Sequence, residues 1–173
     1  MSVSVRARLV LVALAAVLAS ASVGCTGEGE GSTRVGDARQ PAPWDLSTPE
    51  SAVRSYLDWV SLSYRMANSD IPVATMTPDE AVRVDSYIQL NRMEGKGIEQ
   101  SLEVFEIGSV SQEASSAVVT AYEVWTYRYF SLQNLEYVSE PLEATYDTTY
   151  TLEASPAGWV VARVEAEPAG DVE

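Results

Sequence analysis

Residues 117–130, AVVTAYEVWTYRYF, decide the fold class. The run is rich in β-branched and aromatic residues, which favour a strand that is buried on at least one face. Residues 142–154, LEATYDTTYTLEA, show a different pattern. Mostly apolar side chains at the even-numbered positions alternate with acids and threonines at the odd-numbered positions. A strand with one apolar and one polar face is typical of an antiparallel sheet that packs on one side and meets water on the other.

Two shorter segments complete the expected sheet. Residues 102–110 predict a strand before the long run, and residues 159–166 predict a strand after the turn at Ser155-Pro156-Ala157-Gly158. The sequence therefore predicts a sheet of about four strands, connected in sequence order.

Two helices are expected before the strands. Thr48-Pro49 and Thr77-Pro78 each place a capping hydroxyl before a proline at the first helical position. Apolar residues then recur at helical spacing, up to about Asn68 in the first helix and up to Gly95 and Gly97 in the second. Helices followed by a run of strands predict an α+β domain over 44–168: two N-terminal helices packed on a curved antiparallel sheet, with a tail at 169–173.

Composition excludes several kinds of chemistry. The chain of 173 residues has no histidine and one cysteine, which excludes histidine-based triads, histidine-ligated metals and an internal disulfide. Its formal net charge of −14 argues against binding of nucleic acid through a basic patch. We find no motif for a metal or a cofactor and expect neither, and we assign no catalytic residues.

The N-terminal residues 1–24 have the pattern of an export signal. Arg6 and Arg8 precede an apolar stretch over 9–19, and small residues follow it. That stretch is too short to span a bilayer as a stable helix. The sequence SVGC ending at Cys25 resembles a bacterial lipobox, although Ser22 stands where leucine is usual. Cleavage before Cys25 predicts a lipidated first residue, whereas cleavage after Ala21 predicts a secreted protein with a free thiol.

Residues 25–43 join this signal to the domain. The stretch is rich in glycine and polar residues, ends in Pro41-Ala42-Pro43, and shows no periodicity, so we expect a flexible tether that follows the lipidated cysteine. The expected location is extracytoplasmic, with the lipid on Cys25 holding the acidic domain near a cell membrane.

Three segments carry a family resemblance: YEVWTY at 122–127, ATYDTTYTL at 144–152 and GWVVARV at 158–164. They resemble the end of nuclear-transport-factor-2-like cone domains, most closely the C-terminal extracellular domain of the TcaA family of bacterial envelope proteins. Mce-associated proteins are similar more distantly. The resemblance covers about residues 48–166 and implies a pocket between the concave face of the sheet and the helices. It implies function only weakly, because this fold hosts many functions.

Glu123 is the carboxylate of most interest. In a regular strand it shares an apolar and aromatic face with Trp125, where desolvation raises the pKa of an acid. Together with Tyr87 and Tyr146 these two residues are our candidates to line a pocket. The alternatives are that a bulge turns Glu123 to solvent, that it pairs with an arginine, and that the tyrosines only pack the core.

These observations predict a lipid-anchored bacterial envelope protein with a non-catalytic domain that binds a protein, a peptide or a cell-wall-related ligand. An isomerase- or hydratase-type enzyme with Glu123 as its base is the alternative, because ketosteroid-isomerase-like relatives of this fold use a carboxylate in the cone pocket. A homodimer formed through the open sheet is a third possibility.

Overall fold

The computed structural model describes residues 34–169, and these contain two α-helices, a short 3₁₀ helix and four strands. The predicted signal at 1–24, Cys25 and the first part of the tether lie outside the described residues. Within 34–169, no helix is both long and apolar enough to cross a membrane. The elements in chain order are α1 (Pro49–Met66), η1 (Val73–Thr75), α2 (Pro78–Met93), β1 (Lys96–Gln112), β2 (Ser116–Ser131), β3 (Leu142–Ser155) and β4 (Gly158–Pro168).

Helix α1 begins and ends as its sequence predicts. The Thr48 hydroxyl accepts a hydrogen bond from the backbone N–H of Ser51, and the Ser51 hydroxyl accepts one from the backbone N–H of Thr48. This reciprocal pair satisfies two donors that a helix start leaves free. Ala67 ends the helix in the left-handed conformation, with φ of 47°. The helix buries a stripe that includes Val53, Tyr56 and Val60.

Helix α2 is apolar on more than one side. Val84 and Ile88 are buried against the sheet side of the molecule, whereas Val82, Leu90 and Met93 are exposed. Thr77 caps its start, since its hydroxyl accepts from the backbone N–H of Glu80. A residue with positive φ, Gly95, then leads the chain directly into the sheet.

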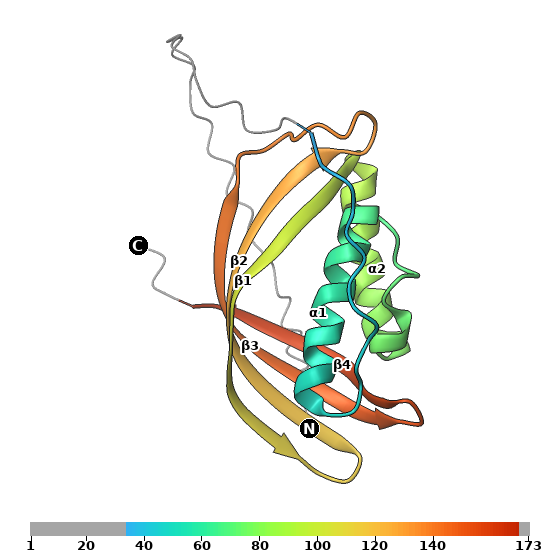
Figure 1. Ribbon diagram of the computed structural model, residues 1–173, viewed down its shortest axis with the longest axis vertical. Coiled ribbons are helices and arrows are strands. Elements are labelled where there is room, and N and C mark those ends of the chain that lie inside the picture. The colour runs from blue at the N-terminus through green and yellow to red at the C-terminus, as the bar shows by residue number, and fades with distance from the viewer. Residues whose placement is uncertain (1–33, 170–173) are drawn as a thin grey trace, which may run out of the picture. The chain divides into compact units, whose positions relative to one another are not determined.

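The strands form one antiparallel meander in the order β1-β2-β3-β4. Both helices lie on the same side of the sheet (Figure 1). Each helix contacts both edge strands, β1 and β4, so the sheet bends around the helical layer. Strand β1 spans 96–112 and is much longer than the predicted 102–110, because its first residues pair with the end of β2. The predicted arrangement of two helices on a four-stranded antiparallel sheet is confirmed.

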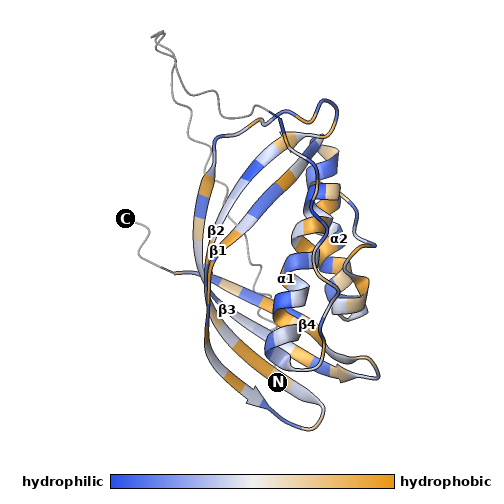
Figure 2. Cartoon of the chain, in the orientation of Figure 1, coloured by the Kyte–Doolittle hydropathy of each residue, from blue (hydrophilic) through white to orange (hydrophobic). Residues whose placement is uncertain are grey.

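The core fills the space between the helices and the concave face. Val119, Leu152 and Val161 of the sheet are completely buried, as are Ala52 and Val53 of α1. Figure 2 shows hydrophobic and hydrophilic bands alternating along the strands, as expected where one face packs and the other is wet.

Residues 34–43, which we call the strap, pack against the domain rather than hanging free of it. The strap runs beside α1 (Figure 1). The backbones of Arg34 and Glu136 pair in an isolated antiparallel β-bridge. The indole Nε1–H of Trp59 donates a hydrogen bond of 3.1 Å to the Ala42 carbonyl. The part of the expected tether that the structure describes is thus held at both of its ends.

Candidate functional site

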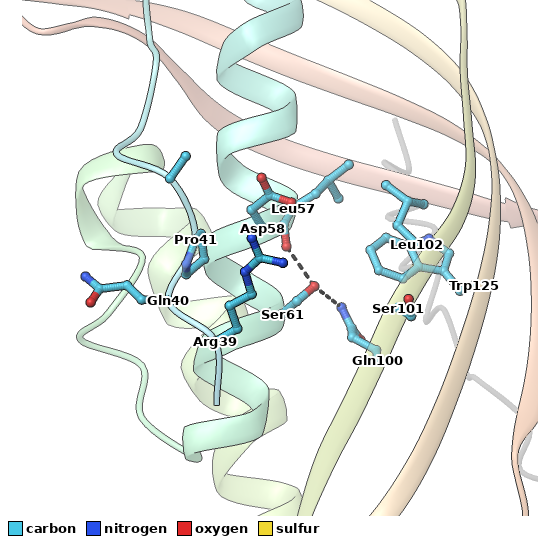
Figure 3. A pocket seen from close by; sticks show the side chains of 11 residues that line it. Arg39, Gln40, Pro41, Leu57, Asp58, Ser61, Gln100, Ser101, Leu102 and Trp125 are labelled. Atoms are coloured by element: carbon cyan, nitrogen blue, oxygen red, sulfur yellow. Dashed lines mark hydrogen bonds between the residues drawn. The ribbon is translucent and has the colours of Figure 1, made fainter. Parts of the chain in front are cut away.

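A pocket of about 570 Å³ opens between the strap, α1 and the first two strands. Its size lies within the usual range for small-molecule sites. Leu57, Leu102 and Trp125 supply its apolar side, and the remaining walls are mostly polar (Figure 3). The polar and strap residues that line it are Arg39, Gln40, Pro41, Ala42, Asp58, Ser61, Gln100 and Ser101.

A hydrogen-bonded pair joins α1 to β1 at this pocket. The Gln100 side-chain amide donates to the Ser61 hydroxyl over 2.9 Å, and that hydroxyl donates to the Leu57 carbonyl over 2.8 Å. Both contacts are drawn in Figure 3. The pair fixes the separation of the two walls and orients the Gln100 side chain.

Asp58 and Arg39 are charged residues on different walls of the pocket, α1 and the strap. Neither makes a hydrogen bond or an ion pair with another residue in the described range 34–169. Desolvation raises the pKa of the Asp58 carboxyl, and the positive charge of Arg54 works in the opposite direction. Arg54 itself lies over the Phe105 ring, with its guanidinium carbon 4.6 Å from the ring centre.

Glu123 lies in the interior, next to the pocket but not in it. Its side chain is buried, with the residue 3% exposed. One carboxylate oxygen accepts a 2.8 Å hydrogen bond from the Trp125 indole N–H, and the other accepts one from the Tyr150 hydroxyl. Trp125 lines the pocket, so Glu123 is one hydrogen bond behind the pocket wall.

Glu123 lies on the apolar inner face of the sheet, as predicted. It is neither turned to solvent by a bulge nor paired with an arginine of the described residues, which were the two alternatives for its side chain. Burial raises the pKa of its carboxyl, and the hydrogen bonds from Tyr150 and Trp125 oppose that rise. No bulge interrupts the pairing of β2 with β3, where Glu123 pairs with Tyr146. Among the described residues no arginine forms an ion pair with Glu123.

A second buried carboxylate, Glu80, lies on α2 and was not anticipated. It accepts hydrogen bonds of 2.8 Å from the Tyr56 hydroxyl and from the Arg83 guanidinium. The Tyr56 and Tyr150 rings meet edge to face, with centres 6.3 Å apart. Each buried acid is therefore held by its own tyrosine, and the two tyrosines touch within the core.

Three of the four pocket candidates do not line the pocket: Glu123 lies behind its wall, Tyr146 lies opposite Glu123 in the sheet, and Tyr87 lies on α2. Tyr87 is 41% exposed on α2, with its ring 5.3 Å from the ring of Tyr64. Tyr146 is half-buried on β3 and packs against the core. Of the candidates, the structure brings Glu123 and Trp125 into contact, and only Trp125 lines the pocket.

A smaller groove of about 470 Å³ shares two strap residues, Gln40 and Pro41, with the pocket. Trp44 and Trp59 line it, with ring centres 5.3 Å apart, together with Gln40, Pro41 and Pro43. The Trp59 indole N–H anchors the strap between this groove and the pocket. No cluster of three or more potential metal ligands occurs in residues 34–169.

Sequence reasoning missed Arg39, Asp58, Ser61 and Gln100 as pocket residues. All are polar residues in segments that read as a tether, a helix surface or an unassigned stretch before the predicted strand. The one available signal was the start of the first strand. A β1 that begins at Lys96 pairs Gln100 with Tyr127, and from there the Gln100 side chain reaches Ser61 of α1.

No protein-family model matches the chain, and no curated protein matches it. Solved structures with a similar fold do exist. The intermembrane-space region of the chloroplast protein ARC6 has a TM-score of 0.60 at 18% identity, over 74% of this chain and 100% of that one. This likeness shows the fold alone.

Other similar structures carry the name of the expected fold. A nuclear transport factor 2 (NTF2-like) superfamily protein from Salmonella enterica has a TM-score of 0.49 at 10% identity, over 70% of this chain and 91% of that one. A ketosteroid isomerase-like protein from Erwinia carotovora has a TM-score of 0.46 at 20% identity, over 70% and 94%. Because both TM-scores are below 0.5, we base no conclusion on these two similarities.

Proposed function

We propose that this protein is an exported, lipid-anchored bacterial envelope protein whose domain binds a ligand without transforming it. The ligand is a peptide, a cell-wall-related molecule or part of an envelope protein. The resemblance of residues 48–166 to the extracellular domain of the TcaA family supports the envelope setting. A homodimer is compatible with this function and is tested by sedimentation of the purified chain.

The observation that carries the binding function is the contrast between the pocket and the buried acid beside it. The pocket is open and has two charged side chains without a hydrogen-bonded or ion-paired partner in residues 34–169. Glu123 has both oxygens engaged by Trp125 and Tyr150. A general base must reach the proton that it abstracts, and here the indole of Trp125 stands between the carboxylate and the pocket.

The proposed anchor is tested on Cys25. Lipidation predicts that the full chain stays with membranes after a high-salt wash, and that Cys25→Ser releases it. Mass spectrometry of the N-terminal peptide must find acyl groups on Cys25. A mature chain that begins at Ser22 with a free thiol would contradict the anchor and support cleavage after Ala21.

The binding function is tested by photo-crosslinking in the native envelope. A photoreactive amino acid replaces Ser101, which lines the pocket but not the groove beside Trp44, or Gln133, which is exposed in the connection between β2 and β3. Ligand binding in the pocket predicts a discrete crosslinked product from position 101 only. Equal products from both positions, or none from position 101, would contradict it.

The enzyme alternative retains one supporting observation: desolvation raises the pKa of Glu123, as expected of a carboxylate that exchanges protons near neutral pH. It requires Trp125 to swing away when substrate enters. Turnover of a captured ligand by the wild-type protein, lost in Glu123→Gln while binding persists, would establish it.

A further inference from the structure

We infer that the pocket recognises a zwitterion with an apolar body, such as a free amino acid or a short peptide, through Asp58 and Arg39. This inference rests on the proposed binding function and specifies its ligand class. It follows from the charges on the two walls and from the apolar surface between α1 and the sheet.

Asp58 supplies the site for a cationic group. Its carboxylate lines the pocket from α1 and has no hydrogen-bonded or ion-paired partner in the described range. The residue as a whole is exposed, yet its surroundings desolvate the carboxylate enough to raise its pKa against the opposing charge of Arg54. A ligand ammonium placed there would restore the interactions that the carboxylate loses on leaving water.

Arg39 supplies the site for an anionic group. It stands on the strap, so it faces the pocket from the opposite side of the opening to β1 and β2 (Figure 3). No ion pair joins Arg39 to Asp58. A guanidinium presents a fork of N–H donors that matches a carboxylate, which makes arginine the usual partner for a carboxylate end group.

The apolar part of the ligand is accommodated by Leu57, Leu102 and the Trp125 ring. The Trp125 N–H is committed to Glu123, so the ring offers this ligand its carbon surface. The Gln100 side chain is held by Ser61, which leaves its amide oxygen as an oriented acceptor. A ligand with an amine, a carboxylate and an apolar side chain matches all three parts of the pocket.

The test uses the full chain and four forms of one dipeptide. Leucyl-leucine carries both charges, its N-acetyl derivative only the carboxylate, its amide only the ammonium, and the doubly blocked form neither. Calorimetry should show leucyl-leucine binding about tenfold or more tighter than either singly blocked form. Tenfold corresponds to about 1.4 kcal/mol, which one hydrogen bond to a charged group supplies.

Charge-neutral variants assign each end of the ligand. Asp58→Asn should remove the preference for a free ammonium, and Arg39→Gln the preference for a free carboxylate. Asp79→Asn and Arg92→Gln, which change exposed charges on α2, serve as matched controls and should leave both preferences unchanged.

Equal binding of the four peptides, or preferences that survive in both pocket variants, would overturn the inference. Absence of leucyl-leucine binding at millimolar concentration would overturn it too. The crosslinking experiment at Ser101 separates this failure from failure of the proposed function. A product at position 101 without zwitterion selectivity leaves the binding function standing and removes only the ligand class.

Discussion

The Trp125 indole N–H donates a hydrogen bond of 2.8 Å to the Glu123 carboxylate, two residues earlier on the same strand. Residues two apart on a strand point to the same face, so this contact follows from the regular alternation of β2. Trp125 lines the pocket, and Glu123 fixes its ring from behind. The buried acid therefore supports the pocket wall.

The first prediction concerns the two hydrogen bonds to Glu123. Glu123→Gln keeps an acceptor for Trp125 and should change the free energy of unfolding at pH 7 by less than about 1 kcal/mol. Glu123→Leu leaves the Trp125 N–H and the Tyr150 hydroxyl unpaired, and should cost about 1–3 kcal/mol for each. Urea denaturation measures both. Glu143→Gln, an exposed substitution on β3, is the control. Equal stability of the Gln and Leu variants would contradict this role.

The second prediction is the pH dependence that Glu123 confers. Burial raises the pKa of Glu123 in the folded protein above the ordinary value of 4.5, so the folded state binds the proton more tightly than the unfolded state. Its contribution to stability is therefore fully present below about pH 4.5 and is lost as pH rises through the folded pKa.

The measurement is the difference in unfolding free energy between wild type and Glu123→Gln across that pH range. Taking this difference cancels the contributions of the other acids to the pH dependence. These acids include Asp58, whose pKa is also raised, and Asp85, whose pKa is lowered. Wild type should lose stability relative to Glu123→Gln with increasing pH. A flat difference, or one of opposite sign, would refute the assignment.

Local sequence patterns predicted most of the fold. Thr48 and Thr77 predicted where the two helices begin. The period-2 alternation of 142–154 predicted β3 to within one residue of its observed end. The first strand was predicted too short because residues 96–101 mix glycine, charged and polar residues, and their pairing with 126–131 is a long-range contact. Local propensity carries no information about such a partner.

The site was less predictable than the fold. Alternation placed Glu123 on the inner face beside Trp125, and the structure agrees. It could not show that Tyr150, four pairs along β3, reaches the same carboxylate. Nor could it show that Arg39, in a segment without any periodicity, forms a pocket wall, because that position depends on the anchoring of the strap by Trp59.

The third prediction concerns a close approach of two chain segments. Gly158 has φ of 125°, and a Cβ there would lie 2.2 Å from the Leu46 carbonyl oxygen. Gly158→Ala should therefore cost about 1–3 kcal/mol or more through backbone strain and steric overlap. Gly36→Ala, which meets nothing within 4 Å, should stay within about 0.5 kcal/mol of wild type. Thermal unfolding of the pair decides; equal melting temperatures would show that Leu46 does not pack where it is placed.

The fourth prediction concerns the anchoring of the strap. Trp59→Phe keeps an aromatic ring but removes the N–H that bonds to the Ala42 carbonyl at 3.1 Å. Loss of about 1 kcal/mol should raise the open population of the strap, and with it the rate of tryptic cleavage after Arg39, about fivefold. Trp44→Phe, which removes no hydrogen bond between described residues, is the control. If both variants are cut at the wild-type rate, the strap is not held by Trp59.

Ligand binding in the pocket is tested most directly by the indole N–H resonance of Trp125, observed by NMR in protein labelled at the indole nitrogen of its four tryptophans. Trp125→Phe identifies the signal, and Trp159, which lies in the core away from the pocket lining, is the internal reference. Addition of an extract of the native envelope should shift the Trp125 resonance and leave that of Trp159 in place. A Trp125 resonance that stays fixed in extracts that shift other tryptophans would contradict ligand binding in this pocket.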